Sequence, residues 1–273
     1  MKASIKRSIM YHYTLDLEIY DPVKTDRNNF HQYIEKANKI IDYIFDKLNN
    51  NKIKITCFVT NEFVEYFKEK CEKKIFPFHE ISCHTSTHFF YNGKNEIQFL
   101  ESIIENKKFL EKITRKSCFG FRAPGAYIPK NFITHLIKLN FSYDSSVIPG
   151  FQPGRNFHFF SPKSPYFPDK NNIYKCGKNQ NQLIEFPLAV FPFFNVNING
   201  FFYPYLFVPL KNYFYQKETT TYIHLQDFMN ITGKKFPWDN FKLEKATLNT
   251  FNELIERYKK TDMSLKNYLN EII

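Results

Sequence analysis

The chain has 273 residues, of which 43% are hydrophobic and 24% are charged, so it can bury a sizeable core and disorder is not expected. Its 38 basic and 27 acidic residues give a net charge of +11, but only six of the basic residues are Arg. Nucleic-acid-binding proteins usually show Arg-rich clusters or a recognisable reading motif, and neither is present here. Nucleic acid is therefore not expected as a partner. Codon composition could account for both the abundant Lys and the 32 Phe and 18 Tyr.

The first residues and the cysteines indicate the compartment. The basic opening is followed by no apolar stretch of signal-peptide length, and no window approaches 18 uninterrupted apolar residues. The five cysteines form no C-x-x-C pair, which favours reduced, mostly structural thiols over a disulfide framework. We therefore expect a cytoplasmic protein without a transmembrane helix.

In the first half of the chain, strand patterns alternate with helix patterns. Apolar residues recur at intervals of three and four over 30–48, which predicts an amphipathic helix. A second helix is expected to begin at Asn61, whose side chain can cap it. Further helices are predicted at 96–113 and 131–140, and strands at 9–17, 53–60, 79–83, 118–121 and 141–144. This alternation is typical of βαβ units and a mainly parallel sheet.

The second half is less regular. Residues 149–181 are rich in Pro, Gly, Asn and Lys and are expected to form an irregular insertion. Strands are predicted at 183–187 and 219–224, and helices at 244–259 and 264–272. The sequence contains no repeat and no linker, so we expect residues 1–273 to form one α/β domain of the barrel type.

The pentapeptide HTSTH at 84–88 is the most informative local pattern. It follows directly on a predicted strand, and barrels of alternating strands and helices carry their active sites at the C-terminal ends of the strands. On a helical turn, His84 and His88 would share one face and reach one metal ion. Such a pair taken alone is more often a surface feature.

Three other predicted strand ends carry polar residues. Asp16 and Glu18 lie two apart, on the same side of a strand. Arg122 precedes a Pro–Gly turn whose backbone N–H groups could face a substrate oxygen, and His224 ends a late strand. Singly, these residues could be a solvated loop, a surface Arg and a core His. Together with the histidine pair they indicate a metal-dependent hydrolase.

The order of these motifs resembles the polysaccharide deacetylase family, also called the NodB-homology domain or carbohydrate esterase family 4. TLDLE resembles the family's T-F-D-D or T-x-D-x-E motif, HEISCHTSTH resembles H-E-I-x-x-H-[ST]-x-x-H, and GFRAPG resembles the R-x-P motif. FSYDSSVIP, LIEFP, NGFFYPY and YIHLQDF are similar to segments of the branch that includes exopolysaccharide-locus deacetylases. The resemblance implies a deformed (β/α) barrel of about seven strands.

The resemblance also implies a role for each matching residue. Asp16 would be the general base towards a metal-activated water, Arg122 would orient Asp16, and His224 would be the general acid that protonates the departing amine. The backbone N–H of Gly125 would help to hold the oxyanion, and Asp144 would support His224. A divalent metal, Zn or else Co or Ni, would be bound by Glu18, His84 and His88.

The sequence departs from the family pattern at one important position. The usual second Asp, adjacent to the base, is Leu17, so either Glu18 or Asp16 itself is the acidic metal ligand.

The resemblance implies removal of an N-acetyl or other acyl group from an amino sugar in a polysaccharide, a lipid-linked precursor or a nucleotide sugar. A deformylase or a cyclic-amide hydrolase of the allantoinase type would use the same site. An inactive carbohydrate-binding relative is the third hypothesis.

The aromatic segment at 200–210 has three interpretations. It could line a sugar-binding cleft, make peripheral contact with the inner face of the membrane, or belong to the barrel core. The sequence does not predict the oligomeric state.

Overall fold

The structure is a computed structural model that describes residues 11–19, 27–150, 158–177, 183–190, 218–229 and 240–272. The main strands are β1 (Tyr11–Leu17), β2 (Thr56–Val59), β3 (Glu80–Cys83), β4 (Gly120–Phe121), β5 (Tyr143–Asp144), β8 (Ile184–Glu185) and β9 (Thr219–His224). The α-helices are α1 (Arg27–Asn50), α2 (Asn61–Lys70), α3 (Glu96–Thr114), α4 (Ile133–Lys138), α6 (Asn240–Arg257) and α7 (Leu265–Ile272).

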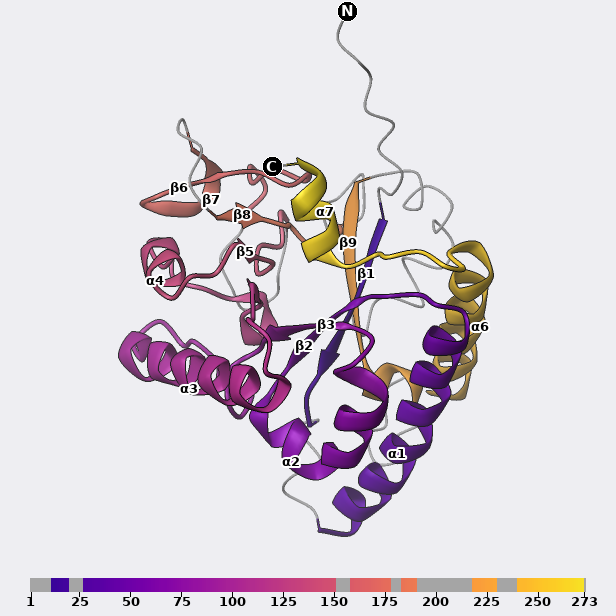
Figure 1. Ribbon diagram of the computed structural model, residues 1–273. Coiled ribbons are helices and arrows are strands. Elements are labelled where there is room, and N and C mark those ends of the chain that lie inside the picture. The colour runs from indigo at the N-terminus through magenta and orange to yellow at the C-terminus, as the bar shows by residue number, and fades with distance from the viewer. Residues whose placement is uncertain are drawn as a thin grey trace, which may run out of the picture.

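The seven main strands form one parallel sheet in the order β8-β5-β4-β3-β2-β1-β9 (Figure 1). A parallel bridge between Leu188 and Thr220 connects the segment after β8 to β9, at the other edge of the sheet. The two edges of the curled sheet therefore meet, and helices α1, α2 and α3 lie outside it. This arrangement confirms the predicted deformed (β/α) barrel; the assignment of the whole of residues 1–273 to one domain stays a prediction.

Strand β9 has the predicted bounds, whereas β2, β3, β4, β5 and β8 are shorter than the runs that predicted them. Two other local predictions are wrong. The cap of α2 is Thr60, whose Oγ1 accepts a hydrogen bond from the backbone N–H of Phe63 at 3.1 Å, rather than Asn61. The segment 149–181 is also not wholly irregular: its described part contains an antiparallel ribbon of β6 (Pro168–Asp169) and β7 (Asn172–Cys176). The aromatic segment at 200–210 lies outside the described residues.

The core fills the barrel and the space between sheet and helices. All seven residues of β1 are buried, as expected for a strand covered on both faces. In the apolar stripe that predicted the amphipathic character of α1, Ala37, Ile41, Ile44 and Leu48 are fully buried, and Phe30, Ile34 and Ile40 are partly buried. All five cysteines carry free thiols, and only Cys176 is exposed. Among the helices that the structure describes, none is long and apolar enough to cross a membrane.

Gly120 in β4 lies directly against the ring of Tyr143, so that an added Cβ would come within 2.0 Å of a ring carbon. The ring cannot easily move, because its hydroxyl is hydrogen-bonded to Ser82 at 2.7 Å and donates to Glu80 at 2.8 Å. We expect Gly120→Ala to lower the free energy of unfolding by about 2–3 kcal/mol, as overpacking of a rigid core does. Urea denaturation measures the loss. Combined with Tyr143→Leu, the cost of Gly120→Ala should shrink; strictly additive losses would contradict the proposed clash.

Two buried histidines make stability depend on pH. Burial lowers the pKa of His12 to about 4, although its ring donates to the Met263 carbonyl, and burial together with Lys54 lowers the pKa of His79 to about 3. Because the unfolded chain binds protons near pH 6.5 and the folded chain does not, stability falls as the pH drops from about 6.5 towards 4.

We expect a loss on the order of 1–2 kcal/mol per histidine between pH 7 and pH 5, measured by urea denaturation at both pH values. The double variant His12→Gln/His79→Gln should show a flatter dependence. His135→Gln, which changes a half-exposed ring beside Glu96, is the matched control. An unchanged slope in the double variant would contradict the assignment.

Candidate metal centre and active site

Glu18, His84 and His88 bring their ligand atoms together within 4.8 Å of one another, and all three side chains are buried. The Oε2 atom of Glu18 lies 3.1 Å from Nε2 of His84 and 2.5 Å from Nε2 of His88. Glu18 follows β1 and His84 follows β3, so the cluster stands at the C-terminal ends of the parallel strands. Three such ligands are the protein donor set of a catalytic divalent-metal site, in which water takes the remaining position.

The two histidines converge for a different reason than their spacing suggested. Residues 84–88 form a loop, not a helical turn, and Thr85 and His88 have left-handed φ values of 62° and 56°. A β-branched residue such as Thr rarely adopts this conformation, so the surrounding structure must hold it in place. The prediction that His84 and His88 share a helical face is therefore wrong, whereas their convergence on one point is found.

Helix α3 supplies the anchors of this loop. Asn106, fully buried, accepts a hydrogen bond from the backbone N–H of His84 at 2.9 Å and donates to the Val59 carbonyl at 3.0 Å. Ser102, one turn earlier, accepts from the backbone N–H of Ser86 at 3.0 Å. Sequence analysis did not identify either residue, although both are polar residues on the otherwise apolar buried face of α3.

A hydrogen bond fixes the tautomer of His84. Its Nδ1 lies 2.8 Å from the carbonyl oxygen of Arg122, and because a carbonyl can only accept, Nδ1 carries the proton. The other ring nitrogen, Nε2, faces Glu18 at 3.1 Å. This arrangement of a backbone carbonyl behind a ligand imidazole is a common way to orient a metal-binding histidine.

The charge on Glu18 is favoured by its neighbours. Burial alone would raise the pKa of this carboxyl group, but the positive charges of His88 and His224 and hydrogen bonds from His84 and His88 hold it well below its usual range. Glu18 is therefore ionised, as a metal ligand must be. The donor set and its charge fit a divalent cation.

Asp16 has a different partner. Its Oδ1 accepts a hydrogen bond at 2.6 Å from Nη1 of Arg122, which also donates to Thr14 at 2.8 Å. Both members of this ion pair are almost fully buried. Asp16 and Glu18 thus separate into two environments on the same strand end: Glu18 lies with the histidines and Asp16 with the arginine.

Arg122 is held rigidly by the loop after β5. Its Nε donates to the Ser145 carbonyl at 2.9 Å and its Nη2 donates to the Ser145 hydroxyl at 2.8 Å. The guanidinium group also stacks over the Phe58 ring, with 4.0 Å to the centroid. Because Arg122 donates to Asp16, these contacts of Arg122 also fix the position of the Asp16 carboxylate.

Asp144 has other partners than the one predicted for it. It hydrogen-bonds to Ser146 at 2.7 Å and to Glu185, with which it forms a fully buried carboxyl pair. Burial raises the pKa of both carboxyl groups, and their mutual repulsion adds to this for Glu185, so the pair retains a proton. Ser146 in turn accepts from the Ala123 backbone at 2.8 Å, which attaches this pair to the loop that follows Arg122. No contact joins Asp144 to His224 within the described part of the chain.

The carboxylate beside His224 is Asp227. Its Oδ2 accepts from the backbone N–H of His224 at 2.9 Å and from the ring Nδ1 at 3.1 Å. Burial lowers the pKa of His224, but the negative charges of Asp227 and Glu18 outweigh that effect and raise it to about 9. Sequence analysis missed Asp227; its spacing of three from His224, at the start of a short helical turn (Leu225–Phe228), was the available signal.

Pairing of β1 with β9 brings Asp16, from the first motif, next to His224, from the last. Asp16 in β1 lies opposite His224 in β9, in a parallel ladder that runs the length of both strands (Figure 1). The Nε2 atom of His224 is 3.8 Å from Glu18. Gly125, predicted to serve the oxyanion, lies in the turn Pro124–Ala126, which Ala123 separates from Arg122, and has a positive φ of 60°. Every predicted site residue belongs to strand ends or loops on this side of the sheet, and Asp144 differs from the others only in its contact partners.

Comparison with protein families gives one match. Residues 30–143 match the family model described as polysaccharide deacetylase. The matched segment contains His84, His88 and Arg122, and it confirms the resemblance that the motifs indicated. Residues 30–143 are thus similar to the polysaccharide deacetylases, and the assignment of the chain to the exopolysaccharide-locus branch stays a prediction.

Solved structures share the fold at low identity. A protein from Mycobacterium smegmatis described as a polysaccharide deacetylase is 15% identical, with a TM-score of 0.66 over 98% of this chain and 92% of its own. A protein of the same description from Pseudomonas aeruginosa is 12% identical, with a TM-score of 0.60 over 96% and 89%. The Puue allantoinase is 12% identical, with a TM-score of 0.59 over 96% and 88%. No curated protein sequence matches the chain.

Proposed function

We propose that this chain is a metal-dependent hydrolase that removes the N-acetyl group from an amino sugar in a polysaccharide or in a lipid-linked or nucleotide-linked precursor. The observation that carries this proposal is the buried Glu18–His84–His88 cluster beside the Asp16–Arg122 pair. The match to the polysaccharide deacetylase family supports the class of reaction.

Glu18, His84 and His88 are the proposed ligands of the metal, with zinc as the first candidate and cobalt or nickel as the others. A divalent metal in this position supplies Lewis acidity, which lowers the pKa of water towards about 7 and polarises an amide carbonyl. The chain's own contribution is a His84 ring fixed by the Arg122 carbonyl, an ionised Glu18, and a buried setting in which charges act strongly.

Asp16 is the proposed general base. It accepts a proton from the attacking water as the new C–O bond forms at the amide carbon. Arg122 keeps one carboxylate oxygen engaged, so that the orientation of Asp16 is constant during the reaction. The backbone N–H of Gly125 is proposed to stabilise the negative charge that develops on the carbonyl oxygen.

His224 is the proposed general acid. It gives its proton to the amide nitrogen as the C–N bond breaks, which releases the free amine and acetate. A histidine whose pKa is raised to about 9 carries this proton at neutral pH. Asp227 holds Nδ1 and thereby directs Nε2 towards the side on which Glu18 lies. The reaction is proposed to take place in the cytoplasm.

We expect Asp227→Asn to lower kcat on the order of 10²-fold, because His224 loses the carboxylate that orients and charges it. Metal content and KM should change little. Steady-state kinetics together with metal analysis measure these effects. Asp227→Glu should recover part of the lost kcat; an unchanged kcat in Asp227→Asn would remove Asp227 from the proposed mechanism.

The proposed function is tested by a screen for acetate and formate release. The purified chain, loaded with zinc, cobalt or nickel, is incubated with N-acetylglucosamine oligomers, nucleotide-linked amino sugars and polyprenyl-linked amino sugars. Allantoin and N-formylated sugars are included as competing substrates. Acetate release that a chelator abolishes and that metal restores supports the proposal.

Each alternative function has its own outcome in this screen. Turnover of allantoin alone would replace the proposal with a cyclic-amide hydrolase, and formate release alone would replace it with a deformylase. A protein that binds no metal and turns over none of the substrates would be an inactive relative. The presence of every proposed catalytic residue type in one buried cluster argues against that last outcome.

A further inference from the structure

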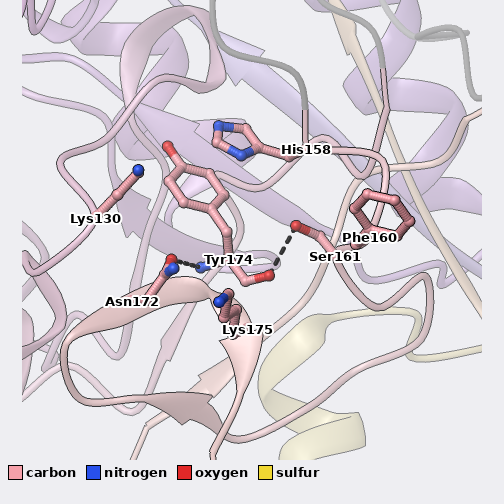
Figure 2. A pocket seen from close by; sticks show the side chains of 7 residues that line it. All are labelled: Lys130, His158, Phe160, Ser161, Asn172, Tyr174 and Lys175. Carbon is pink, nitrogen blue, oxygen red and sulfur yellow. Dashed lines mark hydrogen bonds between the residues drawn. The ribbon is translucent and has the colours of Figure 1, made fainter.

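A pocket lies between β7 and residues 158–161, and none of the proposed metal ligands lines it. It has a volume of about 390 Å³, within the range of ligand-binding sites. Figure 2 shows Lys130 and Phe160 at opposite ends of the pocket, with His158 and Tyr174 between them. Asn172 and Lys175 complete the wall that β7 contributes.

Hydrogen-bond donors outnumber acceptors in this pocket. Lys130 and Lys175 are exposed cations, and none of the described residues that line the pocket is acidic. Asn172 uses its carbonyl oxygen to accept from the Tyr174 backbone at 3.1 Å, which leaves its amide group as a donor. The Nε2 atom of His158 is buried and has no hydrogen-bond partner among the described residues. An anionic group is the chemical complement of this set.

The environment of His158 agrees with this inference. Burial, and then the positive charge of Lys130, lower the pKa of His158 to about 4. The ring is therefore neutral at pH 7. The positive charge of Lys130 beside it is not balanced by any carboxylate among the described residues that line the pocket. A bound anion would supply that compensation.

Aromatic rings give the pocket an apolar side. His158 and Tyr174 stack face to face with 3.5 Å between their centroids, so the two rings form one rigid wall. Phe160 at the rim is fully exposed and Phe159 beside it is 41% exposed. A ligand that combines an anionic group with an apolar ring face, as a charged sugar does, can contact both kinds of surface.

The pocket is attached to the loop that leaves the active site. The Tyr174 hydroxyl donates to the Ile128 carbonyl at 2.7 Å, and the Ile173 backbone N–H donates to the Lys130 carbonyl at 2.7 Å. Ile128 lies three residues after Gly125. One wall of the pocket is thus a direct continuation of the Arg122–Gly125 segment.

We propose that this pocket is a binding subsite for the anionic group of an acidic saccharide. The group is a carboxylate, as in a uronic acid, or a phosphate, as in a sugar phosphate. The saccharide part of the proposal rests on the proposed function, whereas the anion part rests on the lining residues alone. Lys130, Lys175 and the amide of Asn172 contact the charged oxygens, and Phe160 contacts the sugar ring.

Isothermal titration calorimetry on the full chain tests the proposal, with glucuronate, glucose 6-phosphate, glucose and inorganic phosphate as probes. We expect saturable binding of at least one charged sugar and none of glucose. Lys130→Ala/Lys175→Ala should weaken that binding at least tenfold, which separates the pocket from anion binding at the metal centre. Lys170→Ala, an exposed lysine in the turn between β6 and β7, is the matched control.

Phe160→Ala should weaken binding of the charged sugar and leave binding of inorganic phosphate unchanged. The charged sugar that binds more tightly identifies the anion. The proposal is overturned if neither charged sugar binds, if the double lysine variant binds like the wild type, or if inorganic phosphate binds as tightly as the sugars. Because no turnover is measured, failure of the deacetylase assay leaves these results interpretable.

Discussion

Replacing Asp16 with asparagine is expected to reduce turnover about 10²–10⁴-fold while the metal content stays close to that of the wild type. The asparagine has nearly the same shape and can still accept the hydrogen bond from Arg122, but it cannot take a proton from water. Metal analysis and acetate release on the same preparation measure the two effects separately.

A matched control for this change is Asp46→Asn, which alters an exposed carboxylate paired with Lys74. It should behave like the wild type in both assays. Loss of metal from Asp16→Asn would make Asp16 a ligand and would require another base. Thermal denaturation of the variant shows whether the buried Arg122 still has an adequate partner.

Replacing His84 with alanine should remove both metal binding and activity. The change deletes one of three ligands and also the ring that links Glu18 to the Arg122 carbonyl. The remaining pair, Glu18 and His88, offers too few ligands for tight binding of zinc. We expect the metal content to fall from about one ion per chain to near zero, with acetate release reduced to background.

His135→Ala is the control, because it deletes a half-exposed imidazole on α4 whose described ion-pair partner is Glu96. Its metal content should equal that of the wild type. If His84→Ala retained a full complement of metal, the ion would be bound elsewhere and the assignment of the cluster would fail. Added zinc that restored activity to the variant would indicate weakened rather than abolished binding.

The fold class could be predicted from the sequence because the hydrophobic patterns of its helices and strands extend over many residues. The apolar stripe on α1 and the strand runs of the first half each extend over many residues, so errors at single positions do not change the interpretation. The two-residue strands β4, β5 and β8 were overestimated in length, since buried or partly buried residues continue the strand pattern beyond the paired residues, before β4 and β5 and on both sides of β8. Pairing partners, not composition, end these strands.

The candidate site was predicted residue by residue, but not its geometry. The spacing of His84 and His88 suggested a helical turn, whereas hydrogen bonds from Asn106 and Ser102, on a helix that comes later in the chain, fix the loop. Such anchors are tertiary contacts, and no local pattern around residue 84 encodes them.

The acidic residues illustrate the same limit. Sequence alone left Asp16 and Glu18 as alternative ligands, because both point from one strand to the same side. Their roles are separated by neighbours from other strands: Arg122 beside Asp16 and the two histidines beside Glu18. Asp144 was assigned to His224 by resemblance, whereas the structure places Asp227, which the sequence analysis did not identify, beside the His224 ring.

The pairing of β1 with β9 has a consequence for the order of assembly. The three proposed metal ligands come from the first third of the chain: Glu18 follows β1, and both histidines follow β3. Only β2 separates these two strands in the sheet. His224 joins them only when a strand from the last third closes against β1, a contact with a large loop-closure entropy and therefore a late one in folding. During refolding, the ability to bind zinc should accordingly return before the ability to hydrolyse an amide, and the interval between the two would time the closure of the barrel.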